Sequence, residues 1–105
     1  MKIEEMIEID ILMKYYGELL TDKQKGIINL YINNNLSLSE VSENLAISRQ
    51  AVKDSVDTAV NNLKDAEKKL QFIARDSRIK EYIEQIGDNR IDTTARLGLL
   101  SILDE

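Results

Sequence analysis

Two helical segments joined by a tight turn, within residues 37–52, constrain the fold of this chain more than any other feature. Residues 37–40 (Ser-Leu-Ser-Glu) have the form of a capping box that opens a helix. Leu38, Val41, Ser42 and Leu45 keep the i, i+3, i+4, i+7 spacing of one helix face. The core that holds the two motif helices should consist of Val41, Leu45, Ile47, Val52 and Val56. Ser48 then has the place of an N-cap for a second helix. This order predicts a helix-turn-helix, whose second helix presents its opening side chains to a DNA major groove.

The sequence around this motif predicts further helices and no strand. Apolar residues at steps of three and four predict a first helix over about residues 3–19. Residues 21–24 (Thr-Asp-Lys-Gln) form another capping box, and the helix that they open ends in the asparagines at 33–35. We therefore expect an all-α chain in which the motif is one part of a helical bundle.

The helix that Ser48 opens carries a heptad pattern far beyond the motif. Its apolar positions follow alternating steps of four and three and are Val52, Val56, Ala59, Leu63, Ala66, Leu70 and Ile73. Two interpretations remain open for this long helix. It packs on an antiparallel helix of the same chain, or its later positions form a seam for a dimer or another partner. The seam would consist of Ala59, Leu63, Ala66, Leu70 and Ile73.

The C-terminal third reads as a helical arm. A helix with apolar residues from Ile79 to Ile86 is followed by Gly87, a natural helix stop, and Asp92 is placed to cap a last helix. We accordingly divide the chain into a helix-turn-helix bundle with its long helix, residues 1–73, and an arm, residues 74–105. The arm can pack in its own chain or on a second copy.

Composition excludes most enzymatic chemistry. The chain has no His and no Cys, which removes imidazole bases, thiol nucleophiles and the usual zinc ligands. Its glycines are isolated, so no phosphate-binding loop is formed. No apolar run reaches the ~18 residues of a membrane span, and the acidic N-terminus is unlike a secretory signal. We expect a cytoplasmic protein that is not an enzyme and binds no metal or cofactor.

The acidic charge argues against strong nucleic-acid binding. The formal net charge is -5 and the isoelectric point is about 4.8. The stretch 36–75, which holds the motif, is neutral rather than basic, and Asp54 and Asp57 on the second motif helix would repel phosphates. Because nonspecific affinity comes largely from phosphate neutralisation, we expect a monomer to bind in the ~micromolar range or more weakly.

The candidate nucleic-acid contacts open the second motif helix. Arg49 suits guanine and Gln50 suits adenine in a major groove, although both also fit an ordinary solvated first turn. Ser48 is first a helix cap and only second a phosphate ligand. Lys53 is either a phosphate contact or a solvated surface lysine. Further phosphate contacts are expected on the helix before the motif, at Lys23 and Lys25.

Several of these segments together resemble a known family. Residues 19–24 (Leu-Leu-Thr-Asp-Lys-Gln), the apolar helix up to Tyr31, residues 37–41 (Ser-Leu-Ser-Glu-Val) and residues 47–52 (Ile-Ser-Arg-Gln-Ala-Val) resemble the sigma-70 region 4 type of helix-turn-helix. With residues 15–17 (Tyr-Tyr-Gly) ahead of them, the resemblance is to the YlxM family of small bacterial proteins over about residues 9–75. Ser42 occupies a position where such motifs usually have Ala. Its hydroxyl is tolerable there if it bonds back to a helix carbonyl.

The resemblance implies a cytoplasmic, all-helical, sigma-70 region 4-like protein with a regulatory or accessory part in the signal recognition particle pathway. The partner would be DNA, or the RNA or protein of that particle. The alternative is an acidic protein-interaction module without DNA binding, either homodimeric or docking on a targeting GTPase.

Overall fold

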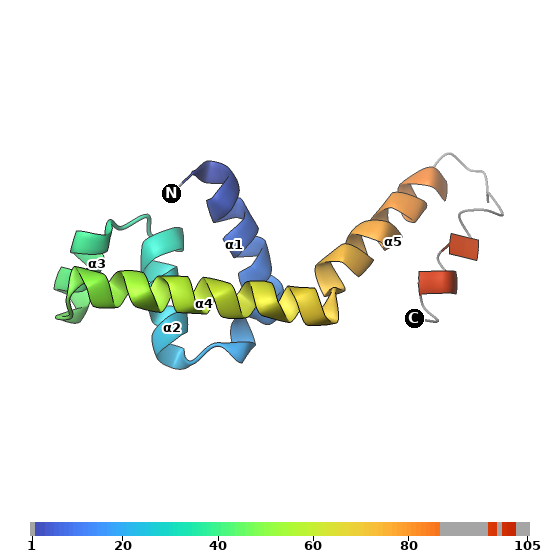
Figure 1. Ribbon diagram of the computed structural model, residues 1–105. Helices are drawn as coiled ribbons and strands as arrows, with labels where there is room; N and C mark the ends of the chain where they lie inside the picture. The colour runs from blue at the N-terminus through green and yellow to red at the C-terminus, as the bar shows by residue number, and fades with distance from the viewer. Residues whose placement is uncertain (1, 87–96, 99, 103–105) are drawn as a thin grey trace. The chain divides into compact units, whose positions relative to one another are not determined.

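The protein is an all-α chain in the computed structural model, which describes residues 2–86, 97–98 and 100–102. Every regular element in these ranges is helical (Figure 1), as expected. The chain divides into two compact units, Met1–Leu70 and Gln71–Glu105. The division therefore falls after Leu70, where the sequence suggested a boundary after residue 73.

The first unit begins with α1, Ile3–Tyr16, which tightens into a 3₁₀ turn at Gly17–Leu19. The next helix, α2, spans Asp22–Ile28 and starts from the expected capping box. Thr21 Oγ1 accepts the N–H of Gln24 at 3.1 Å, and Gln24 Oε1 accepts the N–H of Thr21 at 3.0 Å. A π-helical turn, Asn29–Asn33, extends α2 towards the motif.

The helix-turn-helix consists of α3, Leu38–Leu45, and the start of α4, Arg49–Leu70. The predicted capping box is present at Ser37, whose Oγ accepts the N–H of Glu40 at 3.1 Å while Glu40 Oε1 accepts the N–H of Ser37 at 3.1 Å. Ser42 Oγ donates to the carbonyl oxygen of Ser39 at 2.9 Å, so its hydroxyl does bond back to the helix.

The turn between α3 and α4 depends on a left-handed residue. Ala46 has φ 54°, which is uncommon for a residue with a Cβ. This conformation lets the N–H of Ile47 reach the carbonyl oxygen of Ser42 at 3.1 Å, which satisfies one of the carbonyls left open at the end of α3. The chain then reverses within a few residues and enters α4.

The core of the first unit forms where α1, α2 and α3 pack on one side of α4 (Figure 1). The buried positions of α4 recur at steps of four and three, and the neighbouring helices cover them with aliphatic side chains and one tyrosine. These core residues are Ile9, Leu12, Tyr16, Leu20, Ile27, Ile28, Ile32, Val41, Val52, Val56, Ala59, Leu63 and Ala66. The expected motif core is confirmed at Val41, Val52 and Val56. Of the other two residues expected there, Ile47 is half-buried and Leu45 is 37% exposed.

The heptad positions of α4 are used within the chain as far as Ala66. Ala59 and Leu63 are fully buried and Ala66 is 8% exposed, so they offer a second protomer no surface. Leu70, at the end of the helix, is 48% exposed. Ile73 lies on a different helix, because Gln71 adopts φ 55° and ends α4. The long helix therefore ends before Ile73, and packing within the chain applies to Ala59, Leu63 and Ala66. A partner contact at Leu70 and Ile73 stays a prediction.

A partly buried hydrogen bond joins α1 to the far half of α4. The ring of Tyr16 is 2% exposed, and its hydroxyl donates to Glu67 Oε1 at 2.6 Å. Hydrogen bonds to a charged acceptor are stronger than those between neutral groups. The long helix is thus held by the motif near its start and by α1 near its end.

The second unit contains α5, Phe72–Ile86, and helical residues at 97–98 and 100–102. Gly98 lies so close to the ring of Tyr82 that a Cβ would overlap it, and Ile102 is buried. The unit therefore has packing of its own. The predicted helix stop at Gly87 and the predicted cap at Asp92 lie outside the described residues.

Candidate nucleic-acid interface

Three of the predicted contact residues share one surface at the start of α4. Arg49, Gln50 and Lys53 are all exposed. Together with Leu38, at the start of α3, they line an open cleft of about 320 Å³. The fold therefore brings a guanidinium, an amide and an ammonium group together where a helix-turn-helix meets a major groove.

Ser48 acts as the cap of α4, as its position in the sequence indicated. Its Oγ accepts the N–H of Ala51 at 3.0 Å. This bond satisfies one of the open N–H groups at the helix start and fixes the direction in which α4 leaves the turn. The second role considered for Ser48, as a phosphate ligand, stays a prediction.

Two aspartates of α4 hold two of these contact residues in the free protein. Gln50 Nε2 donates to Asp54 Oδ1 at 2.8 Å, and Lys53 Nζ donates to Asp57 Oδ2 at 2.8 Å. Both pairs span one helical turn, the spacing at which side chains on a helix surface meet. A ligand that contacts Gln50 or Lys53 therefore meets a carboxylate already bound to the same group.

Asp57 also acts on the titration of Lys53. The hydrogen bond that Lys53 donates to Asp57 and the negative charge of that carboxylate raise the pKa of Lys53 above the ordinary lysine value. A lysine is already charged at neutral pH, so this shift leaves the charge of the ammonium group there unchanged. Lys53 can therefore attract a phosphate, but in the free protein it is already bound to Asp57.

The two lysines of α2 differ in their surroundings. Lys25 Nζ lies 3.1 Å from Glu18 Oε2 and its side chain is only 26% exposed. Lys23 is exposed and borders a groove of about 510 Å³ that also contains Leu45 and Ile47 of the motif turn. Neither lysine lines the cleft of Arg49 and Lys53. The structure thus groups the α4 candidates and leaves Lys23 and Lys25 outside that group.

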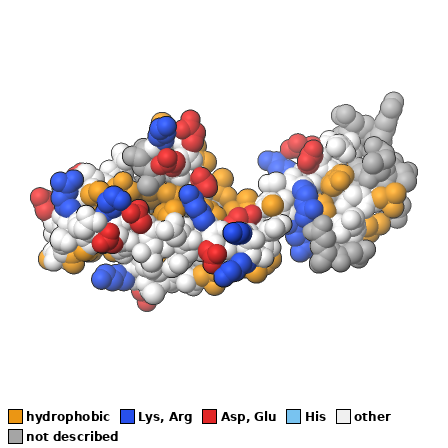
Figure 2. All heavy atoms as spheres, in the orientation of Figure 1, with side chains coloured by type: hydrophobic (Ala, Val, Ile, Leu, Met, Phe, Trp, Pro, Cys, Tyr) orange, Lys and Arg blue, Asp and Glu red, His pale blue; other side chains and the backbone are white. Residues whose placement is uncertain are grey.

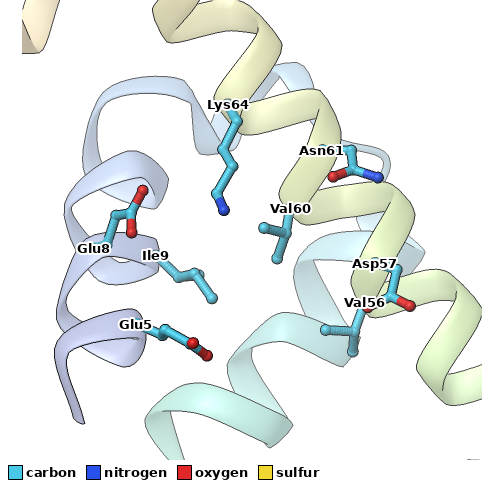
Figure 3. A pocket seen from close by; sticks show the side chains of 8 residues that line it. All are labelled: Glu5, Glu8, Ile9, Val56, Asp57, Val60, Asn61 and Lys64. Atoms are coloured by element: carbon cyan, nitrogen blue, oxygen red, sulfur yellow. The ribbon is translucent and has the colours of Figure 1, made fainter. Parts of the chain in front are cut away.

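Charges of both signs are mixed over the surface. Figure 2 shows acidic and basic side chains interspersed on the face in view, with hydrophobic side chains between them. A second cleft, of about 500 Å³, lies between α1 and α4 and is lined by Glu5, Glu8, Asp57 and Lys64 among others. Figure 3 shows Glu8 and Lys64 extending from the two helices on the same side of Ile9. This cleft is a mixed-charge surface and not a phosphate site.

Other kinds of site find no support in the part of the chain that the structure describes. Within those ranges no group of three or more acidic residues is placed to hold a metal ion. None of the described helices combines the length and the apolar character that crossing a bilayer requires.

Two features of this interface were not foreseen from the sequence. The i, i+4 pairs of Gln50 with Asp54 and of Lys53 with Asp57 follow from helical spacing, which was a usable signal. The second feature is the groove beside Leu45, which is lined by residues of α2 and of the motif turn. It depends on how α2 and α3 pack together, and a local sequence pattern does not predict that packing.

Comparison with known proteins gives the chain its family. Residues 3–100 match the family described as "UPF0122: Putative helix-turn-helix protein, YlxM / p13 like". The chain is 44% identical over 92 residues to the UPF0122 protein MYPE4850 of Malacoplasma penetrans, which covers 87% of this chain and 85% of that protein. It is also 43% identical over 90 residues to the UPF0122 protein NT01CX_2214 of Clostridium novyi. That match covers 82% of this chain and 78% of the other protein. The resemblance to YlxM proteins is confirmed, and the chain belongs to the UPF0122 family of YlxM/p13-like proteins.

Proposed function

We propose that this protein is a non-enzymatic regulatory or accessory protein that binds nucleic acid through the start of α4. The observation that carries the proposal is the shared cleft of Arg49, Gln50 and Lys53 at the open end of a helix-turn-helix. In this proposal Arg49 and Gln50 contact base edges, while Lys53 contacts the phosphate backbone. Ser48 and Lys23 supply secondary phosphate contacts, and Lys25 does so only by leaving Glu18.

The charge balance sets the expected strength of binding. The carboxylates of Asp54 and Asp57 compete with phosphates for Gln50 and Lys53. Few other cations lie beside this cleft, so the electrostatic contribution is small. We therefore infer ~micromolar affinity for a monomer and a clear loss of affinity as salt rises.

The nucleic acid that fits the family is either duplex DNA or the RNA of the signal recognition particle. This part of the proposal is supported by the resemblance to YlxM proteins, and it includes a cytoplasmic location. A homodimer would double the number of contacts and would raise the affinity of either complex.

The test is a fluorescence anisotropy titration of labelled duplex DNA and of the particle's RNA at about 50 and 200 mM salt. Arg49→Ala should weaken binding by about fivefold or more, since a good side chain–base contact is worth ~1–3 kcal/mol. Arg78→Ala, an exposed arginine on α5, carries the same charge change and serves as the control. Equal losses from the two variants, or no salt-dependent binding to either nucleic acid, would overturn the proposal.

A second candidate function is docking on a protein, such as a targeting GTPase. The groove that contains Leu45, Ile47 and Leu30 favours it, because partly exposed aliphatic side chains at a motif turn suit a protein contact. Titrating the purified targeting GTPase against the chain tests this candidate. Leu45→Asp should abolish that binding and leave nucleic-acid binding unchanged, whereas Arg49→Ala should have the opposite pattern.

A further inference from the structure

The side-chain amide of Gln50 can offer a ligand either of two opposite groups. The amide oxygen accepts hydrogen bonds, and the amide nitrogen donates them. The two groups read different bases in a major groove, because guanine and thymine present carbonyl oxygens there while adenine and cytosine present amino groups. A base contact from Gln50 is therefore selective only if the orientation of its amide is fixed.

Asp54 fixes the orientation of this amide. Gln50 Nε2 donates to Asp54 Oδ1 at 2.8 Å. An ionised carboxylate only accepts hydrogen bonds, so the amide nitrogen has to face Asp54, and the amide oxygen is turned away from it. Within the described part of the chain this oxygen accepts no hydrogen bond, and Gln50 is exposed in the cleft at the start of α4. Gln50 therefore keeps its oxygen and the second hydrogen of its amide nitrogen for a ligand.

We propose that Asp54 is a positioning residue that presents Gln50 to DNA as an acceptor, so that the protein selects an amino base, above all adenine, opposite Gln50. Adenine offers its N7 acceptor beside the amino group, which suits the remaining N–H of the amide, whereas cytosine offers the amino group alone. Guanine and thymine would bring a carbonyl oxygen against the amide oxygen. This role of Asp54 rests on the proposed function, with duplex DNA as the ligand.

Asp54 and Asp57 differ in what they hold. Asp57 binds Lys53, and the contact of a lysine with a phosphate carries no base preference. Asp54 does not line the cleft and would act on a ligand through Gln50. Both carboxylates repel phosphates, so removal of either should raise the affinity for DNA. Only the removal of Asp54 should also change which base is preferred.

Sequencing the duplexes that the full chain selects from a randomised pool at about 50 mM salt tests the proposal. Gln50→Ala identifies the base position that Gln50 reads, because the preference at that position is lost. There the wild-type chain should prefer adenine over guanine by about fivefold or more. Asp54→Asn should lower this preference by about twofold, because an asparagine can donate as well as accept and lets the amide of Gln50 turn over. The overall affinity of the same variant should rise.

Asp57→Asn is the matched control, because it removes the same charge from the same helix without touching the partner of Gln50. It should raise the affinity and keep the base preference. An unchanged preference in Asp54→Asn, an equal loss in Asp57→Asn, or a wild-type chain without a preference for an amino base at that position overturns the role of Asp54 while DNA binding persists. A wild-type chain that binds no duplex overturns DNA binding and this role together. Unchanged circular dichroism of the variants excludes unfolding as the cause.

Discussion

Neutralising Asp57 should strengthen nucleic-acid binding, and the structure allows the size of the effect to be worked out. In the free protein Asp57 Oδ2 lies 2.8 Å from Lys53 Nζ, with the two side chains 57% and 56% exposed. An exposed ion pair at i, i+4 shifts an equilibrium by about twofold. A carboxylate roughly 8 Å from a phosphate in water opposes binding by about twofold more. Asp57→Asn should therefore tighten binding by about fourfold to fivefold.

The aspartate further along the same helix provides the control. Asp65 Oδ2 lies 2.9 Å from Lys69 Nζ in a pair of the same spacing and similar exposure. Asp65→Asn changes the net charge by the same amount but lies well beyond the motif. We expect it to change affinity by less than about 1.5-fold, since separated exposed charges are screened over ~10 Å.

The assay is fluorescence anisotropy with a labelled duplex at about 50 and 200 mM salt. The gain from Asp57→Asn should be larger at the lower salt, because screening weakens both the ion pair and the repulsion. Equal gains from Asp57→Asn and Asp65→Asn would refute the reasoning, since net charge alone would then account for them. No gain at the lower salt would show that Lys53 does not contact the ligand.

The remaining predictions concern the stability of the first unit and can be checked by urea unfolding followed by far-ultraviolet circular dichroism. Tyr16→Phe should lower the free energy of unfolding by about 1–2 kcal/mol, because it removes the hydrogen bond to Glu67; an unchanged midpoint would contradict this. Ala46→Gly should raise it by up to about 1 kcal/mol, because the left-handed backbone strains a Cβ and not a glycine; a loss of stability would show that the strain is absent. Val52→Asn should leave the unit unfolded, since the side chain is fully buried and an amide there has no polar neighbour at hand; a folded variant that only loses ligand binding would count against that.

The local signals of the sequence specified the motif well. The capping boxes at Thr21 and Ser37 are confirmed. They were predictable because each depends only on four consecutive residues. The buried positions of α4 as far as Ala66 follow from their spacing for the same reason. Spacing alone could not reveal which helices cover them, and so it left open the choice between packing in one chain and pairing of two.

The errors arise where a backbone conformation departs from the residue that usually adopts it. Gln71 is left-handed without being glycine, so the heptad pattern seemed to continue into Ile73. Ala46 also has a left-handed backbone, at a turn position where glycine is more usual, but the turn itself was predicted. The exposure of Leu45 had a different cause, because it depends on the separation of α2 and α3, which is a tertiary quantity.

The candidate site was predictable as a set of residue types and not as a set of contacts. Arg49, Gln50 and Lys53 were identified from their place in the motif, and the structure brings them to one cleft. Lys25 was chosen on charge alone, and its pairing with Glu18 depends on the turn between α1 and α2.

The position of the motif at the beginning of α4 has a consequence for how the protein opens. The helix that offers Arg49 and Lys53 to solvent also supplies Val52, Val56, Ala59 and Leu63 to the core. Loops and terminal helices commonly open by themselves, while the segments that form the core exchange their amide hydrogens only on global unfolding. Amides of α4 from Val52 to Leu63 should therefore exchange at the slowest rate in the first unit, and those of the first turn faster. The helix that carries the recognition surface would then persist until the whole bundle is lost.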